Sequence, residues 1–128
     1  MSRIVLDSGA LIALEHNDRA LWAALKLAAL RSTDVLVPST CLAQVWRGTA
    51  RQNRLGLALR HCVVAEFDSL AREVGELCGR THTTDICDAH VALVAARESD
   101  ALYTSDPGDL GRLLRALGGR GAVAVIRC

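Results

Sequence analysis

The sequence is short of several features, and each shortage narrows what the chain can be. Lys26 is the only lysine among 15 basic residues, and the net charge is +1, so no overall basic field marks a nucleic-acid-binding protein. The five cysteines are odd in number and include no C-x-x-C pair. Such a set disfavours a disulfide framework or a zinc site and is typical of reduced thiols, so we expect a cytoplasmic protein.

The sequence also lacks targeting and nucleotide-binding signals. A signal peptide is not expected, because no basic segment followed by an apolar one precedes the first strand. The longest apolar stretches, around residues 21–30 and 89–96, are too short or too charged to cross a bilayer, so no membrane association is expected. There is no Walker glycine loop or G-x-G-x-x-G motif, and no Ser-His-Asp or Cys-His arrangement that would favour acyl transfer.

What is present is a globular composition with a regular pattern. The 128 residues are 51% hydrophobic and 23% charged, which suits a single domain spanning residues 1–128. Strands are predicted at residues 3–6, 34–37, 62–65, 100–104 and 122–126, and helices at 10–15, 19–30, 39–52, 54–60, 69–79, 85–98 and 107–117. This alternation predicts an α/β fold with a central five-stranded parallel sheet flanked by helices on both faces.

Polar residues and glycines predict where several helices begin and end. Asp18 and Asp68 stand where they would cap the helices that follow, and Ser39 or Thr40 would cap the helix after the second strand. Gly79 is expected to end its helix, as is the Gly118-Gly119 pair near the end of the chain.

Three aspartates are predicted to meet at one edge of the sheet. Asp7 and Asp106 directly follow strands, and Asp88 lies in the first turn of the helix that leads to the fourth strand. These positions all belong to the carboxyl edge, where open parallel sheets bind their ligands. Asp34 and Asp100 precede their strands and are expected at the opposite edge.

Each of these acids also has a purely structural interpretation. Asp7 suits an N-cap, and Asp106 is followed by Pro107 at the favoured first helical position, with Asp109 placed to suit the helix dipole. Asp85 and Asp88 are spaced like a capping box. No single carboxylate is decisive, and the hypothesis of a site depends on their convergence.

Converging carboxylates repel one another unless a cation neutralises them. Oxygen ligands select hard cations, Mg²⁺ or Mn²⁺, over zinc or copper. Cys87 and His90 neighbour Asp88 but point off its face, so Cys87 is interpreted as core and His90 as core or surface. A hard metal held by carboxylates most often serves phosphate chemistry, because it polarises a phosphoryl oxygen and activates water.

At this point the motifs resemble a known family. The relevant blocks are Asp7-Ser8-Gly9-Ala10-Leu11-Ile12, Pro38-Ser39-Thr40, Asp88-Ala89-His90-Val91-Ala92, and Tyr103-Thr104-Ser105-Asp106-Pro107-Gly108-Asp109-Leu110. Together they resemble a PIN domain, and specifically a VapC-type toxin from bacterial toxin–antitoxin pairs. The resemblance covers the whole chain in order, and the block from Thr104 to Asp109 is its most suggestive part.

The resemblance implies a PIN-like fold and a Mg²⁺-dependent endoribonuclease, with Mn²⁺ as a substitute. Asp7, Asp88 and Asp106 carry over as catalytic, metal-binding carboxylates, and Asp109 as a further metal-site acid. Thr104 or Ser105 would hydrogen-bond a carboxylate or a metal-bound water. The implied partners are an RNA substrate and a small antitoxin that occludes the site. A homodimer or toxin–antitoxin hetero-oligomer is implied as well.

One departure from the family pattern leaves a second hypothesis open. Gln44 stands where the family normally has a glutamate, so the site loses one charge there, and Asp85 is a candidate substitute. The alternative is therefore a catalytically weak or inactive binding module that acts through its antitoxin. A phospho-acceptor receiver domain is disfavoured because Lys26, the only lysine, is misplaced. A haloacid-dehalogenase-like phosphatase would need an acid where Gly9 stands.

Several basic residues and one tryptophan lie near the predicted site in the sequence. Arg47, Arg51 and Arg112 are candidates for gripping RNA phosphates, although a solvated helix face explains them equally well. Trp46 is spaced helically with Leu42, which favours a core or dimer-interface role over a platform for stacking bases.

Overall fold

The computed structural model describes residues 2–118 and 123–128 and confirms the predicted fold class. The strands are β1 (Arg3–Leu6), β2 (Asp34–Pro38), β3 (Val63–Ala65), β4 (Ala101–Thr104) and β5 (Ala124–Arg127). The α-helices are α1 (Ser8–Glu15), α2 (Arg19–Leu30), α3 (Ser39–Val45), α4 (Asn53–Leu59), α5 (Ala71–Thr81), α6 (Ile86–Glu98) and α7 (Pro107–Ala116). Two 3₁₀ turns, η1 (Ala50–Gln52) and η2 (Asp68–Leu70), complete the order. The predicted roles of Gly119 and Ala122 fall outside the described residues.

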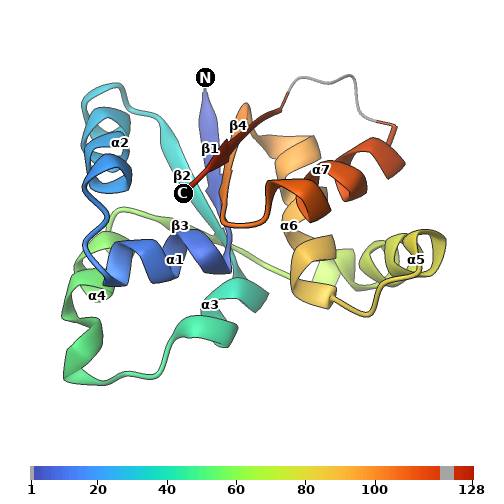
Figure 1. Cartoon of the computed structure of the whole chain (residues 1–128), viewed down its shortest axis with the longest axis horizontal. Helices are drawn as coiled ribbons and strands as arrows, with labels where there is room; N and C mark the ends of the chain where they lie inside the picture. The colour runs from blue at the N-terminus through green and yellow to red at the C-terminus, as the bar shows by residue number, and fades with distance from the viewer. Residues whose placement is uncertain (1, 119–122) are drawn as a thin grey trace.

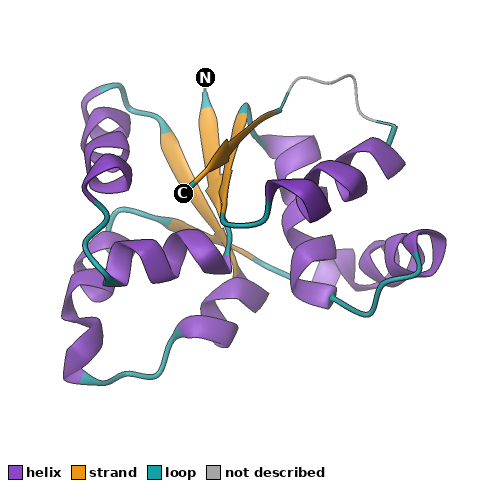
Figure 2. Ribbon diagram, in the orientation of Figure 1, coloured by secondary structure: helices purple, strands orange, loops and turns teal. Residues whose placement is uncertain are grey.

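The strands form one parallel sheet in the order β3-β2-β1-β4-β5 (Figure 2). Its central strand β1 pairs with both β2 and β4, so that Ile4 lies opposite Val35 and Ala101. Val5 and Leu6 are fully buried, as expected for a strand covered on both faces.

The helices form a layer on each side of the sheet (Figure 1). The chain moves from β1 outward to β3 and then returns to β4 and β5 on the other side of β1. Because parallel crossovers are right-handed, this reversal puts α1, α2 and α4 on one face and α5, α6 and α7 on the other. The reversal point between β1 and β4 is where such folds bind ligands, at the carboxyl ends of the strands.

The helix predicted over residues 39–52 is shorter than expected. It ends at Val45, where Trp46 takes an extended conformation and Gly48 adopts a φ of 73°. The helical spacing of Leu42 and Trp46 suggested continuity, but the backbone turns away and resumes in η1. The predicted cap was also wrong, because Pro38 occupies the N-cap position and no side chain bonds the first turn.

The helix predicted over residues 69–79 is displaced toward the C-terminus. Asp68 begins the 3₁₀ turn η2 and makes no side-chain cap bond, so the predicted cap was wrong. The helix α5 runs past Gly79 to Thr81 and ends at His82 in the left-handed conformation. The other predicted cap, Asp18, accepts a hydrogen bond from the Leu21 amide at 3.0 Å and is confirmed.

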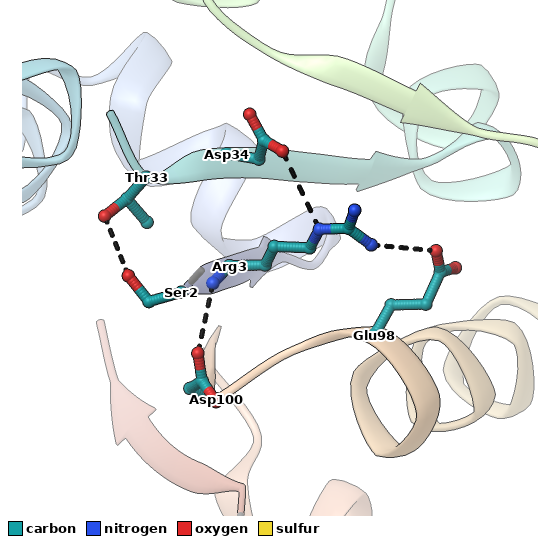
Figure 3. A network of polar contacts seen from close by, with 6 residues as sticks. All are labelled: Ser2, Arg3, Thr33, Asp34, Glu98 and Asp100. Carbon is teal, nitrogen blue, oxygen red and sulfur yellow. Dashed lines mark hydrogen bonds and ion pairs between the residues drawn. The ribbon is translucent and has the colours of Figure 1, made fainter. Parts of the chain in front are cut away.

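The amino edge of the sheet has its own polar network, centred on Arg3 (Figure 3). The Arg3 amide donates to Asp100 at 3.1 Å, and its guanidinium lies 3.7 Å from Asp34 and 3.4 Å from Glu98. The predicted position of Asp34 and Asp100 at this edge is therefore confirmed. These ion pairs are half exposed and add little stability, but they match the acids of this edge with a cation.

Candidate active site

Asp7 ends the central strand and begins the first helix. Its carboxylate accepts a hydrogen bond from the Ala10 amide at 2.9 Å, so the structural interpretation as an N-cap is confirmed. Only 5% of the residue is exposed. Burial raises the pKa of the Asp7 carboxyl, and the negative charge of Asp106 raises it further, while hydrogen bonds from the Thr104 side chain and the Ala10 amide oppose the shift.

Asp106 reaches the same place from the neighbouring strand β4. It caps α7, accepting from the Asp109 amide at 3.2 Å, with Pro107 in the first turn as predicted. The Asp106 amide in turn donates to the Thr104 hydroxyl oxygen at 2.9 Å. The fully buried Thr104 therefore contacts both Asp106 and Asp7 and fixes them relative to each other.

Asp88 completes the convergence from the opposite helical layer. It lies half-buried in the first turn of α6, and its amide donates to the Asp85 cap at 2.9 Å. Burial and the nearby charges of Asp85, Asp7 and Asp106 raise the pKa of the Asp88 carboxyl to about 7. The three acids predicted to share the carboxyl edge thus lie close enough to repel one another.

Three helices, α1, α6 and α7, begin at this cluster with an aspartate as the cap. Helix N-termini carry partial positive charge and favour anions, so they offset part of the repulsion and also suit a phosphate. At the amino edge the acids have the cation Arg3 beside them, whereas at the carboxyl edge burial, and then the charges of Asp85, Asp7 and Asp106, raise the pKa of Asp88.

The carboxylates of Asp7, Asp88 and Asp106 suit a hard cation, because they offer only oxygen atoms as ligands. Within residues 2–118 and 123–128 no three acidic, histidine or cysteine side chains stand close enough together to enclose a metal. Mg²⁺ does not require such a cage, since it usually binds one or two carboxylates and keeps several waters. The cluster therefore fits a partly hydrated Mg²⁺ better than a fully protein-ligated ion.

Gln44 lies beside the cluster, although it is on the separate helix α3. Its side-chain oxygen accepts a hydrogen bond of 2.5 Å from the Ser8 hydroxyl, next to Asp7. The amide therefore occupies the position where the resemblance expects a fourth acid, and its oxygen is already engaged. Asp85 is exposed and acts as a cap, and Asp109 is exposed one turn into α7.

A groove of about 880 Å³ is lined by Ser8 and Ser105, the sequence neighbours of Asp7 and Asp106. Its walls include Ser8, Gly9, Gln44 and Ser105 from the site and two of the three candidate RNA-binding arginines, Arg47 and Arg51. Gly9 and Ser105 meet so closely that a Cβ on Gly9 would overlap the Ser105 side chain. The groove joins the acidic edge to the basic segment after α3.

The third candidate, Arg112, has a different setting. Its guanidinium donates to the Thr81 carbonyl at 2.9 Å and so ties α7 to the end of α5. Arg47 also bonds its own helix end, donating to the Ala43 and Trp46 carbonyls, but it stays exposed on the groove. The phosphate-gripping role of all three arginines stays a prediction.

Gln52 is a residue that the sequence analysis missed. It is buried, and its amide oxygen accepts from the Arg47 and Gly48 amides at 2.7 and 3.1 Å. Its amide nitrogen donates to Glu15 and to the Val45 carbonyl, both at 2.9 Å. One side chain thus shapes the turn after α3. Nothing in its sequence context marks it, because these partners become neighbours only on folding.

Burial decides whether two residues belong to the core. His90 is completely buried between the Thr40 hydroxyl at 2.8 Å and the Glu66 carbonyl at 3.1 Å, so it is a core residue, and burial lowers its pKa. Trp46 is 41% exposed, so the core half of its interpretation was wrong, and the dimer-interface half stays a prediction.

Comparison with known proteins identifies the fold. No protein-family model matches the chain, and no curated protein matches it significantly. Its structure is similar to a chain in the crystal structure of VapBC2 from Rickettsia felis bound to a DNA fragment from their promoter. The similarity covers 98% of each chain with a TM-score of 0.69 and 13% sequence identity. The chain therefore has a PIN-like α/β fold, shared over almost its whole length with this VapBC2 chain.

Proposed function

We propose that the chain is the toxin of a toxin–antitoxin pair and acts as a Mg²⁺-dependent endoribonuclease. The observation that carries the proposal is that Asp7, Asp88 and Asp106, at the starts of three different helices, approach one another at the carboxyl edge, where the charges of Asp7 and Asp106 add to burial and to Asp85 in raising the pKa of Asp88. Fold alone does not assign activity, so the argument depends on this cluster and the basic groove beside it. The likeness to VapBC2 supports the toxin role.

In this proposal one or two of the carboxylates of Asp7, Asp88 and Asp106 bind the cation directly, and the others hydrogen-bond the waters that it keeps. A bound Mg²⁺ would supply Lewis-acid chemistry for hydrolysis of an RNA phosphodiester, by polarising a phosphoryl oxygen and by favouring the deprotonation of water. Thr104 orients Asp7 and Asp106 by its hydroxyl contacts with both. The N-termini of α1 and α7 favour the negative charge that develops on the phosphate. Mn²⁺ would substitute for Mg²⁺ with the same ligands.

The partners follow from the same proposal. VapBC2 is described as a complex bound to promoter DNA, which supports an antitoxin partner for this chain. We propose that it assembles as a toxin–antitoxin hetero-oligomer or homodimer and cleaves RNA in the cytoplasm. The part of the chain that the structure describes contains no helix long and apolar enough to cross a membrane.

The test is cleavage of total cellular RNA by the purified chain, freed of any partner. We expect cleavage with Mg²⁺ or Mn²⁺, none with EDTA, and none from Asp7→Asn or Asp88→Asn. Asparagine caps helices as well as aspartate, so Asp7→Asn keeps the start of α1. Asp34→Asn, at the opposite edge, is the matched control and should cleave normally.

Gln44 supports one second candidate, a binding module with little catalysis. Its amide replaces a charge in the metal site and is engaged by Ser8. Absence of cleavage under every metal, from a folded chain that still binds its antitoxin, would reject the nuclease and favour this module.

A further inference from the structure

The segment from α3 to α4 is strongly basic for a chain with a net charge of +1. Between Asp34 and Glu66 the sequence contains no acidic residue and four arginines, Arg47, Arg51, Arg54 and Arg60. All four are exposed. Figure 1 shows this segment as one continuous arm along the molecule's lower edge, from α3 to α4. It therefore presents a local field that attracts a polyanion.

A second hollow of about 560 Å³ adjoins the groove of about 880 Å³. The two share Thr49, Ala50 and Gln52 as walls, so they lie next to each other. Trp46 lines the second hollow, together with polar and basic groups that include Asn53 and Arg60. Together the two hollows extend from Ser8 and Ser105, which are next to Asp7 and Asp106 in the sequence, past Arg47 and Arg51 to the ring of Trp46.

Two glycines lie beside the indole of Trp46 and leave the ring uncovered. A Cβ on Gly48 would lie 3.7 Å from its Nε1, and one on Gly56 would lie 3.6 Å from its Cη2. Longer side chains at these positions would cover opposite ends of the ring. Position 48 also favours glycine because its φ is 73°. The buried Gln52 holds this turn by accepting hydrogen bonds from the backbone amides of Arg47 and Gly48.

We propose that the hollow beside Trp46 is a subsite for an unpaired base of single-stranded RNA, which stacks on the indole. Exposed aromatic rings within basic grooves bind single strands in this way, because every base has a face to stack while the phosphates meet the arginines. The inference rests on the proposed function, which supplies RNA as the ligand, and it adds where the RNA strand lies on the protein. The alternative occupant is an apolar side chain of a protein partner. Arg47, Arg51 and Arg60 line the two hollows against one acid, Glu15, which is hydrogen-bonded by Gln52, and this excess of positive charge favours RNA.

The test measures binding without catalysis. A fluorescently labelled, unstructured oligoribonucleotide of roughly 12 nucleotides, within the site sizes of single-strand binders, is titrated in EDTA. We expect Trp46→Leu to weaken binding about 5- to 150-fold, the loss that corresponds to one base stack. Trp46→Phe should recover part of the affinity, and duplex RNA should bind both forms equally. The control Leu30→Ala removes another exposed apolar side chain, on α2, and should change nothing.

An abasic scan then tests the stack directly. Each oligonucleotide in the scan lacks one base. At one position of the oligonucleotide, removal of the base should weaken binding to the wild type and should not change the affinity of Trp46→Leu. The proposal is overturned if Trp46→Leu binds the single strand within about twofold of the wild type, the result expected for a protein-partner surface. It is overturned equally if no abasic position couples to Trp46.

This outcome is separable from that of the nuclease proposal. Metal-dependent cleavage together with unchanged binding by Trp46→Leu keeps the nuclease and rejects the subsite. Binding that depends on Trp46 without cleavage under any metal keeps the subsite and rejects the nuclease. A wild type that neither binds nor cleaves RNA rejects both.

Discussion

At the scale of single residues, the aspartates of the carboxyl edge differ in what they do for the fold. Asp7 and Asp106 cap helices and so stabilise them, as caps typically do by about 1 kcal/mol. Asp88 caps nothing, and its raised pKa means that its ionised form costs folding free energy. The three therefore respond differently to neutralisation.

Asp88→Asn should stabilise the metal-free protein above neutral pH. The pKa of Asp88 is about 7 in the folded chain and 3.8 in the unfolded one, so its favourable contribution is complete below pH 4 and lost as the pH rises through 7. In EDTA we expect the variant to melt above the wild type at pH 8 and to lose this advantage by pH 4. Thermal melts across that range measure it, with Asp34→Asn as control, and an advantage that grows toward pH 4 would contradict the prediction.

Gln44→Glu should strengthen metal binding. The change returns a charge beside Asp7, where the amide now accepts from Ser8, and an exposed charge of this kind contributes about 1 kcal/mol, or roughly fivefold in affinity. Calorimetric titration with Mg²⁺ measures the change. Ala43→Glu, one residue earlier and also exposed, carries the same charge outside the groove and should show a smaller effect. Equal affinity in all three proteins would exclude Gln44 from the site.

At the scale of elements, the site depends on how closely α1 approaches the loop after β4. Gly9 allows this approach because its missing Cβ leaves room for Ser105. The same loop carries Asp106, so the contact sets the position of one acid relative to another. The motif Asp7-Ser8-Gly9 is thus a packing requirement as well as a turn.

Gly9→Ala should disturb the site and destabilise the chain. The added methyl would lie 2.6 Å from the Ser105 Cβ, and overpacking of this kind costs about 1–3 kcal/mol. Urea unfolding measures the loss, and Ser105→Gly in the same chain should restore part of it. Gly75→Ala, in the open on α5, is the matched control and should instead gain about 0.5–1 kcal/mol. A stable Gly9→Ala chain with full affinity for Mg²⁺ would refute the packing argument.

The sequence predicted the elements well where local chemistry decides them. A helix cap depends on residues within one turn of it, and the predicted caps are found at Asp7, Asp18, Asp85 and Asp106. The five strands were predicted from short apolar runs, which are also local features of the sequence. The end of α3 was missed because it depends on Gln52, seven residues beyond, whose partners include Glu15 on another helix. The groove could not be predicted either, since its walls come from distant segments.

At the scale of the whole molecule, the net charge of +1 conceals an uneven distribution. Acids gather at the carboxyl edge and in the Arg3 network, while the charged side chains of the arm from α3 to α4 are all arginines. RNA binding should therefore depend on salt through this arm rather than through the protein's overall charge.

Arg51→Ala should reduce the salt dependence of RNA binding. Each phosphate contact to a single strand contributes about 0.7 to the slope of log affinity against log salt, so the slope should fall by about that amount. Arg51 lines the groove, whereas Arg72, exposed on α5, does not and serves as the control. Affinities measured at several salt concentrations give the slopes, and equal slopes for the two variants would place the strand elsewhere.

Asp7 and Asp106 cap helices and are also proposed to bind the metal, and these two roles affect how such a sequence would evolve. In a lineage that had lost all activity, selection on the fold would confine positions 7 and 106 to residues that cap helices, such as aspartate, asparagine, serine or threonine. Asp88 would drift first, since folding favours its replacement. Of the three aspartates, Asp88 is thus the one whose presence the stability of the metal-free fold does not explain.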